Sequence, residues 1–223
     1  MSEYSKLEER LIESAQKVRI LSKGSNVKLW VAYKKVGDLL YTLMEHGARE
    51  PDFLTDSCSN RVSLTANMVQ SFHIVKDLIL SGAYWSTSAV LRQHMETLAR
   101  IIEYREDNII RDKKPPNVRV LPFNMAPNYG RLSELCHTSG GEVLGDFSGC
   151  AEGEGIAATT PVYREEWAES LLSLHIAYML ALAIEIYLLQ VELYQKSNLP
   201  NIDNDIMEIA KILVETGFWK ELT

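Results

Sequence analysis

One stretch of the sequence limits the fold more than any other, the run LLSLHIAYMLALAIEIYLLQV over residues 171–191. As a helix it is long enough to cross the hydrocarbon core of a membrane. However, it contains His175, Glu185 and Gln190, and a carboxylate near the middle of a lone span costs about 3 kcal/mol. Its flanks also hold no cluster of Lys and Arg that would set an orientation. We therefore interpret the run as the buried central helix of a soluble bundle.

Helical periodicity continues through most of the remaining chain. It predicts helices over about 7–24, 29–47, 60–81, 85–106, 129–137, 163–196 and 203–215. In the third of these, one apolar stripe is expected to face the core, and it consists of Val62, Ala66, Val69, His73 and Leu80. The predicted fold class is all-α, a bundle of four or five long helices with short helices and a long Gly-rich insert at 138–161.

The chain is expected to form a single helical domain. An N-terminal helical hairpin covers 1–48, a core bundle covers 60–196 with the loop 138–161, and a C-terminal helix lies within 201–223. With 223 residues, 46% of them hydrophobic, such a domain can bury a core without a disulfide or metal. No cofactor or structural metal is therefore expected.

The location of the protein is inferred from its cysteines and its N-terminus. Cys58, Cys136 and Cys150 are odd in number and form no CxxC pair, which favours a reducing compartment with free thiols. The charged residues 1–13 lack the apolar region of a signal peptide. We therefore expect a cytoplasmic protein that does not act at a membrane.

The formal net charge of −7 excludes a broadly basic protein that coats nucleic acid. One local basic cluster follows the fourth predicted helix and comprises Arg111, Lys113, Lys114 and Arg119. Such a cluster either meets phosphates or remains a solvated loop. Any phosphate-binding site is therefore confined to a small part of the surface.

Arg92 and Glu96 lie four residues apart on the fourth predicted helix, so their side chains can touch. One hypothesis is that Glu96 orients the Arg92 guanidinium toward a cleft, where it binds an anion. The alternatives are an ion pair that joins two helices, or a solvated helix face.

The segment NYGRLSELCHTSGG, at 128–141, carries two overlapping motifs. Glu134 and His137 have the spacing of half a carboxylate-bridged di-metal site. No second Glu-x-x-His occurs in the chain, so a ferritin-like di-iron site is not expected. Arg131 and His137 form an Arg-x5-His pair. Alternatively, Leu132 and Leu135 simply dock a short helix on the bundle.

The Arg-x5-His pair resembles the Arg-x4-6-His motif of the HEPN superfamily of helical proteins, many of which are metal-independent ribonucleases. A wider resemblance is to bacterial helical families of unknown function. It is carried by Arg92 and Glu96 on one long helix and by Tyr129, Leu132-Ser133-Glu134 and His137 after it. The resemblance implies catalysis by His137 as general acid or base and stabilisation of phosphoryl charge by Arg131, helped by Arg92 and Glu96. It also implies an RNA substrate and a homodimer.

Two other classes of function remain open. The chain could be a non-catalytic helical module that binds a protein partner or a small ligand. It could also be another enzyme, including a metal-dependent one, that uses some of His73, His94, Glu96, His137 and His175. Because His73 and His175 lie on apolar helix faces, we expect them in the core, each with a ring N–H bonded to a carbonyl.

Overall fold

The fold was examined in a computed structural model of the chain. The structure describes residues 2–52, 54–107, 114–136, 158–194 and 199–219, and within these ranges it contains helices and no strands. The long helices are α1 (Glu3–Ser25), α2 (Val27–Gly47), α3 (Asp56–Gln70), α5 (Tyr84–Arg105) and α8 (Glu165–Leu193). Shorter elements are α4 (Phe72–Leu80), the 3-10 turn η1 (Val118–Val120), α6 (Asn128–Cys136) and α9 (Asp203–Glu215). The predicted all-α fold is confirmed.

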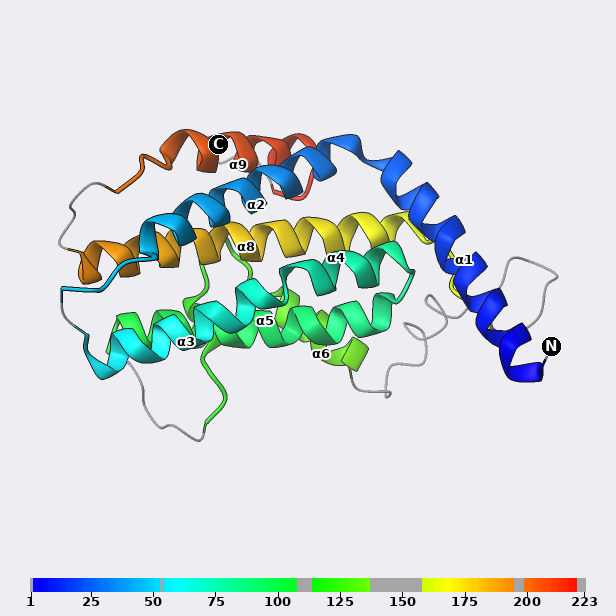
Figure 1. The fold of residues 1–223 in the computed structure, drawn as a ribbon, viewed down its shortest axis with the longest axis horizontal. Helices are drawn as coiled ribbons and strands as arrows, with labels where there is room; N and C mark the ends of the chain where they lie inside the picture. The colour runs from blue at the N-terminus through cyan, green and yellow to red at the C-terminus, as the bar shows by residue number, and fades with distance from the viewer. Residues whose placement is uncertain (1, 53, 108–113, 137–157, 195–198, 220–223) are drawn as a thin grey trace.

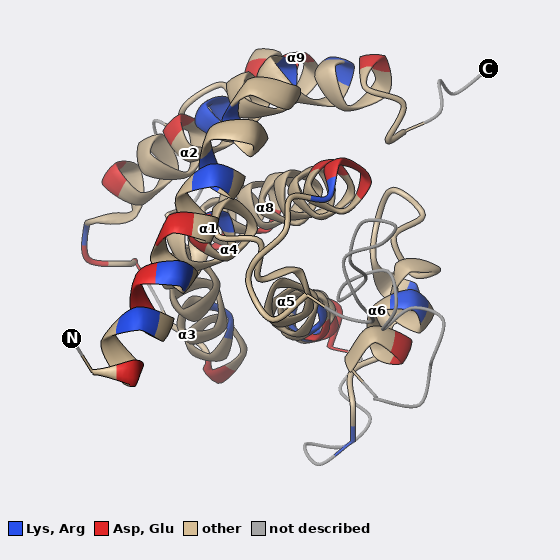
Figure 2. Ribbon diagram, turned by 90° about the vertical axis from the view of Figure 1, so that its right-hand side faces the viewer, with Lys and Arg blue, Asp and Glu red and all other residues tan. Residues whose placement is uncertain are grey.

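The apolar run predicted as the central helix forms most of α8, which lies in the middle of the bundle (Figures 1 and 2). Helices α2 and α9 cover one side of it, while α3, α4 and α5 cover the other. By length and composition α8 is able to cross a membrane, but 83% of its most apolar window is buried by the other helices. Burial on all sides accounts for a helix that is apolar around its whole circumference.

Side-chain caps fix where several helices begin. The Ser2 hydroxyl accepts a hydrogen bond from the backbone N–H of Ser5, and the Asn26 side chain accepts one from Leu29, so α1 and α2 start at defined residues. The Thr55 hydroxyl accepts one from Cys58. This cap starts α3 at Asp56, earlier than the periodicity predicted, and shortens the expected loop before it.

The third predicted helix is in fact two helices, α3 and α4, separated at Ser71. The Ser71 hydroxyl donates to the carbonyl of Met68 over 2.7 Å, a local bond that competes with helical continuation. The face predicted to be buried was wrong at Val62, Ala66 and His73, which are exposed, whereas Leu80 is buried and Val69 packs partly buried against the core. The residues of α3 that face the interior are Cys58, Arg61 and Met68.

The other predicted boundaries agree with the structure to within a few residues, and α9 has the predicted bounds. Gly82 follows α4 with φ +75°, and Gly217 follows α9 with φ +78°, so both glycines end helices in the left-handed region. The short helix α6 docks on the bundle through Leu132 and Leu135, which are both buried. Most of the Gly-rich insert predicted at 138–161 lies outside the described residues.

Candidate functional site

The residues predicted on α5 meet a tyrosine from α6. The Arg92 Nε atom lies 3.3 Å from Glu96 Oε1, as the four-residue spacing predicted. The same carboxylate oxygen accepts a hydrogen bond from the Tyr129 hydroxyl over 3.0 Å. Arg92 Nη2 in turn donates to the Tyr129 oxygen over 3.2 Å. The three side chains therefore form a closed triangle across two helices, which we call the Arg92 triad.

The Arg92 triad lies at the surface of the bundle, half-buried. The Arg92 side chain is 24% exposed and that of Glu96 is 32% exposed, so both are partly open to solvent. The hydrogen bond with Tyr129 is the largest of the effects that raise the pKa of Arg92 above its usual value, and the charge of Glu96 adds a smaller one. The triad thus presents a permanently charged guanidinium in a fixed orientation, which suits recognition of a phosphate or carboxylate.

Arg131 does not join this triangle. Its guanidinium lies over the ring of Trp167 on α8, 4.6 Å from the ring centroid, in a cation–π contact. This contact leaves Arg131 exposed on the short helix that also supplies Tyr129. His137, the predicted general acid or base, lies outside the described residues and directly follows the last residue of α6, Cys136.

A second carboxylate of α5 anchors the segment that leads to α6. Glu103 is buried, its Oε2 atom pairs with Arg100 over 2.9 Å, and its Oε1 atom accepts the backbone N–H of Asn117 over 2.7 Å. Arg100 also donates to the carbonyl of Lys114. These bonds hold the chain from Lys114 onward against α5. Arg111 and Lys113 of the predicted basic cluster lie outside the described residues.

The histidines that were considered as catalytic or metal-binding residues do not form a common site among the described residues. His94 and His175 are buried with ring centroids 6.1 Å apart. Neither ring nitrogen of His175 has a well-aligned hydrogen-bond partner among the described residues, although the backbone of Phe72 lies close enough to favour the protonated ring. His73 is exposed, which contradicts its predicted place in the core. Within the described part of the chain, no three His, Cys, Asp or Glu side chains gather as a metal site.

Tyr129 was not among the predicted site residues, although it opens the motif that carries the family resemblance. Its role depends on the packing of α6 against α5. A cue was present in the sequence, because a tyrosine two positions before Arg131 lies on a different face of the same helix. Tyr129 and Arg131 therefore reach toward α5 and α8 respectively.

The chain was compared with protein-family models, with curated proteins and with solved structures, and none of them matches.

Proposed function

We propose that the surface formed by α5 and α6 binds RNA and cleaves it without a metal ion. The observation that supports this most is the Arg92 triad, which holds a partly exposed guanidinium beside the helix that carries Arg131 and leads into His137. Arg92, Arg131 and the histidine that follows α6 in the sequence are the residue types that phosphodiester cleavage needs, because charge builds up on the phosphoryl oxygens.

The reaction expected from this residue set is an internal transfer. The ribose 2′-OH loses its proton to a base and attacks the adjacent phosphorus, while the bond from phosphorus to the 5′-oxygen breaks. The leaving oxygen takes up a proton, so the products are a 2′,3′-cyclic phosphate and a 5′-hydroxyl. His137 would serve as the base or the acid, and Arg92 and Arg131 would stabilise the phosphoryl oxygens.

Within this proposal Glu96 and Tyr129 are positioning residues. Both bond Arg92, and neither is placed to carry positive charge to a phosphate. Arg92→Lys would keep the charge but lose the planar fork that meets both partners. We therefore expect Arg92→Lys to reduce cleavage almost as much as Arg92→Ala.

The test is cleavage of a labelled single-stranded RNA in EDTA. Wild type should produce 2′,3′-cyclic phosphate ends and leave intact an oligonucleotide with 2′-deoxyribose throughout. His137→Ala and Arg92→Ala should each lose about 100-fold or more in rate. The matched control is Arg10→Ala, which removes an exposed arginine from α1 and should cleave normally.

Intact RNA with the wild-type protein would contradict the proposal, as would equal cleavage by wild type, His137→Ala and Arg92→Ala. The resemblance also implies a homodimer, which light scattering coupled to size exclusion measures directly. A monomer that cleaves RNA would retain the proposed chemistry and refute only the dimer.

A further inference from the structure

The first helix, α1, extends beyond the bundle, and its N-terminal end lies away from the other helices (Figure 1). Its buried residues are Val18 and Ser22, which belong to its second half, where it contacts α4 and α8. Residues 3–13 hold no buried side chain. A helical segment of this length is only marginally stable in water unless its apolar face is covered.

The apolar face that fixes α1 on the bundle continues along the extended half. Tyr4, Leu7, Leu11 and Val18 follow one another at spacings of three, four and seven residues, the pattern of a coiled-coil seam, and we call them the α1 stripe. Val18 is buried at one end, but Tyr4 is 72% exposed, Leu7 53% and Leu11 37%. Three large apolar side chains on one face of a projecting helix indicate a surface for association.

The charges of α1 are separated along its length, and this separation indicates what covers the stripe. Residues 3–13 contain four glutamates and only two cations. Residues 17–23 contain Lys17, Arg19 and Lys23 and no carboxylate. A second α1 in the antiparallel direction brings the acidic half of each helix toward the basic half of the other. A parallel pair would instead place like charges side by side.

We propose that the α1 stripe pairs with the same stripe of a second copy of this chain, in the antiparallel direction. When the extended segments are aligned, Leu7 of one copy lies beside Leu11 of the other. Tyr4 then lies beside Ser14 and Ala15, whose small side chains leave room for its ring. Because the two copies present the same surface, every contact occurs twice and the assembly closes as a dimer.

The flanks of the paired helices set the direction. Glu3 and Lys17 are two heptads apart, so they lie on the same flank of α1. In the antiparallel pair Glu3 of each copy meets Lys17 of the other, whereas in a parallel pair Glu3 would meet Glu8. Near the two-fold axis Arg10 approaches Arg10 of the other copy, and the interface is small. The dimer is therefore expected to be weak.

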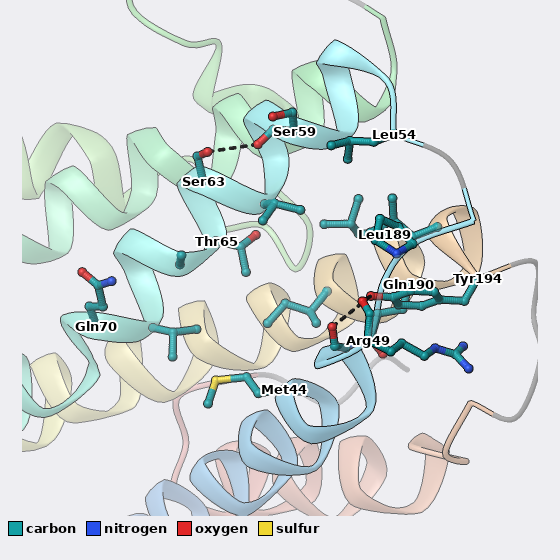
Figure 3. A pocket seen from close by; sticks show the side chains of 17 residues that line it. Met44, Arg49, Leu54, Ser59, Ser63, Thr65, Gln70, Leu189, Gln190 and Tyr194 are labelled. Carbon is teal, nitrogen blue, oxygen red and sulfur yellow. Dashed lines mark hydrogen bonds between the residues drawn. The ribbon is translucent and has the colours of Figure 1, made fainter.

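Another apolar surface competes for the role of partner. A pocket of about 620 Å³ opens between α2, α3 and α8 (Figure 3). It lies at the end of the bundle away from α1, so α1 does not reach it within one chain (Figure 1). In a second copy it could receive α1, but the charge separation of α1 would then have no role. Ala66→Trp, which fills this pocket, distinguishes the two arrangements and should leave the dimer intact.

The first experiment is sedimentation velocity on the full chain. Between about 5 and about 200 µM, wild type should convert from monomer to dimer, with a Kd on the order of 10–100 µM. Leu11→Glu should remain a monomer throughout this range. The matched control is Ile20→Glu, because Ile20 is 73% exposed on the opposite face of the same helix. It should dimerise as wild type does, and both variants should keep the circular dichroism spectrum of wild type.

The second experiment tests the direction by cross-linking and leaves the stripe unchanged. Glu3→Cys and Lys17→Cys chains of different mass are mixed and treated with a short bis-maleimide. A dimer that joins the two variants is expected. Glu3→Cys alone should not cross-link to itself, because the two positions are about 18 Å apart along the antiparallel pair. Wild type, treated in the same way, controls for the native cysteines.

A wild-type chain that is monomeric at about 200 µM would overturn the proposal, and so would a dimer that Leu11→Glu leaves intact. Self-cross-linking of Glu3→Cys without the mixed product would overturn the antiparallel direction. A dimer that both Leu11→Glu and Ala66→Trp abolish would place α1 in the pocket of the second copy instead. The α1 stripe shares no residue with the Arg92 triad, so this proposal and the RNA proposal can each fail alone.

Discussion

His94 and His175 meet in the centre of the bundle, and acid should destabilise the protein by protonating them in the unfolded chain. His94 is 3% exposed and His175 is fully buried. The His94 Nε2 atom lies 2.5 Å from the Ser71 hydroxyl, at the break between α3 and α4. His175 packs against Phe72 at a ring distance of 5.3 Å. No acidic side chain contributes to the electrostatics of either ring.

The burial of the two rings sets the sign and size of the change in stability with pH. Desolvation lowers the pKa of His94 from 6.5 to about 4, and burial together with the nearby His94 lowers the pKa of His175 to about 3. The unfolded chain therefore binds more protons between pH 6.5 and these lower values, so stability is complete above pH 6.5 and is lost as the pH falls. At pH 5 both rings are still neutral in the folded protein. The loss between pH 7 and pH 5 is about 2 kcal/mol for each histidine and about 4 kcal/mol for the pair.

Urea unfolding followed by circular dichroism at pH 7, 6 and 5 measures this loss. Other titrating groups also contribute, so the difference between wild type and variants is the decisive quantity. His94→Gln and His175→Leu should each remove about 2 kcal/mol of the pH dependence, whatever they cost at pH 7. The control His46→Gln removes an exposed histidine at the end of α2 and should follow wild type. Parallel pH profiles for all four proteins would refute the reasoning.

Two further predictions concern stability and are read from urea unfolding at pH 7. Arg61 is 1% exposed and pairs with the half-exposed Glu192 over 2.6 Å, so Glu192→Ala removes the direct ion-pair partner of a buried charge and should cost about 2–3 kcal/mol. A loss below about 1 kcal/mol would mean that Arg61 finds another partner. Gly82→Ala should cost about 2 kcal/mol and Gly217→Ala about 1 kcal/mol. Both glycines have positive φ, but only at Gly82 would the new Cβ meet neighbours, Pro161 and Val18 at 3.3 Å. Equal losses at the two glycines would contradict this account.

The sequence predicted the helices well where one local signal set both their ends and their buried face. In α2 the buried residues Leu29, Val36, Leu40 and Leu43 repeat at helical spacing, and Gly47 ends the helix. In α8 the apolar circumference allowed either a core helix or a membrane span, and Glu185 together with flanks that hold no cluster of Lys and Arg favoured the core helix. The pair Arg92 and Glu96 was predicted from spacing for the same reason, because its geometry is internal to one helix.

Contacts between segments that are far apart in the chain could not be predicted from the sequence. Tyr129 reaches the Arg92 triad only because α6 docks on α5, and Arg61 finds Glu192 across 131 positions of chain. No Gly or Pro marks the break at Ser71 in the sequence. Its cause is a serine hydroxyl shared between the carbonyl of Met68 and the buried His94, and that histidine belongs to another helix.

The prediction for α3 failed in the first part of its apolar stripe. Val62, at 43% exposure, and Ala66 face outward, although Val69 still packs against the core, while Arg61 faces the interior at 1% exposure. Burying this part of the stripe and exposing the arginine would stabilise the fold more. Burial of an apolar side chain stabilises the folded state, whereas burial of a charge destabilises it. A periodicity that identifies an apolar face therefore does not by itself identify which part of that face the rest of the chain covers.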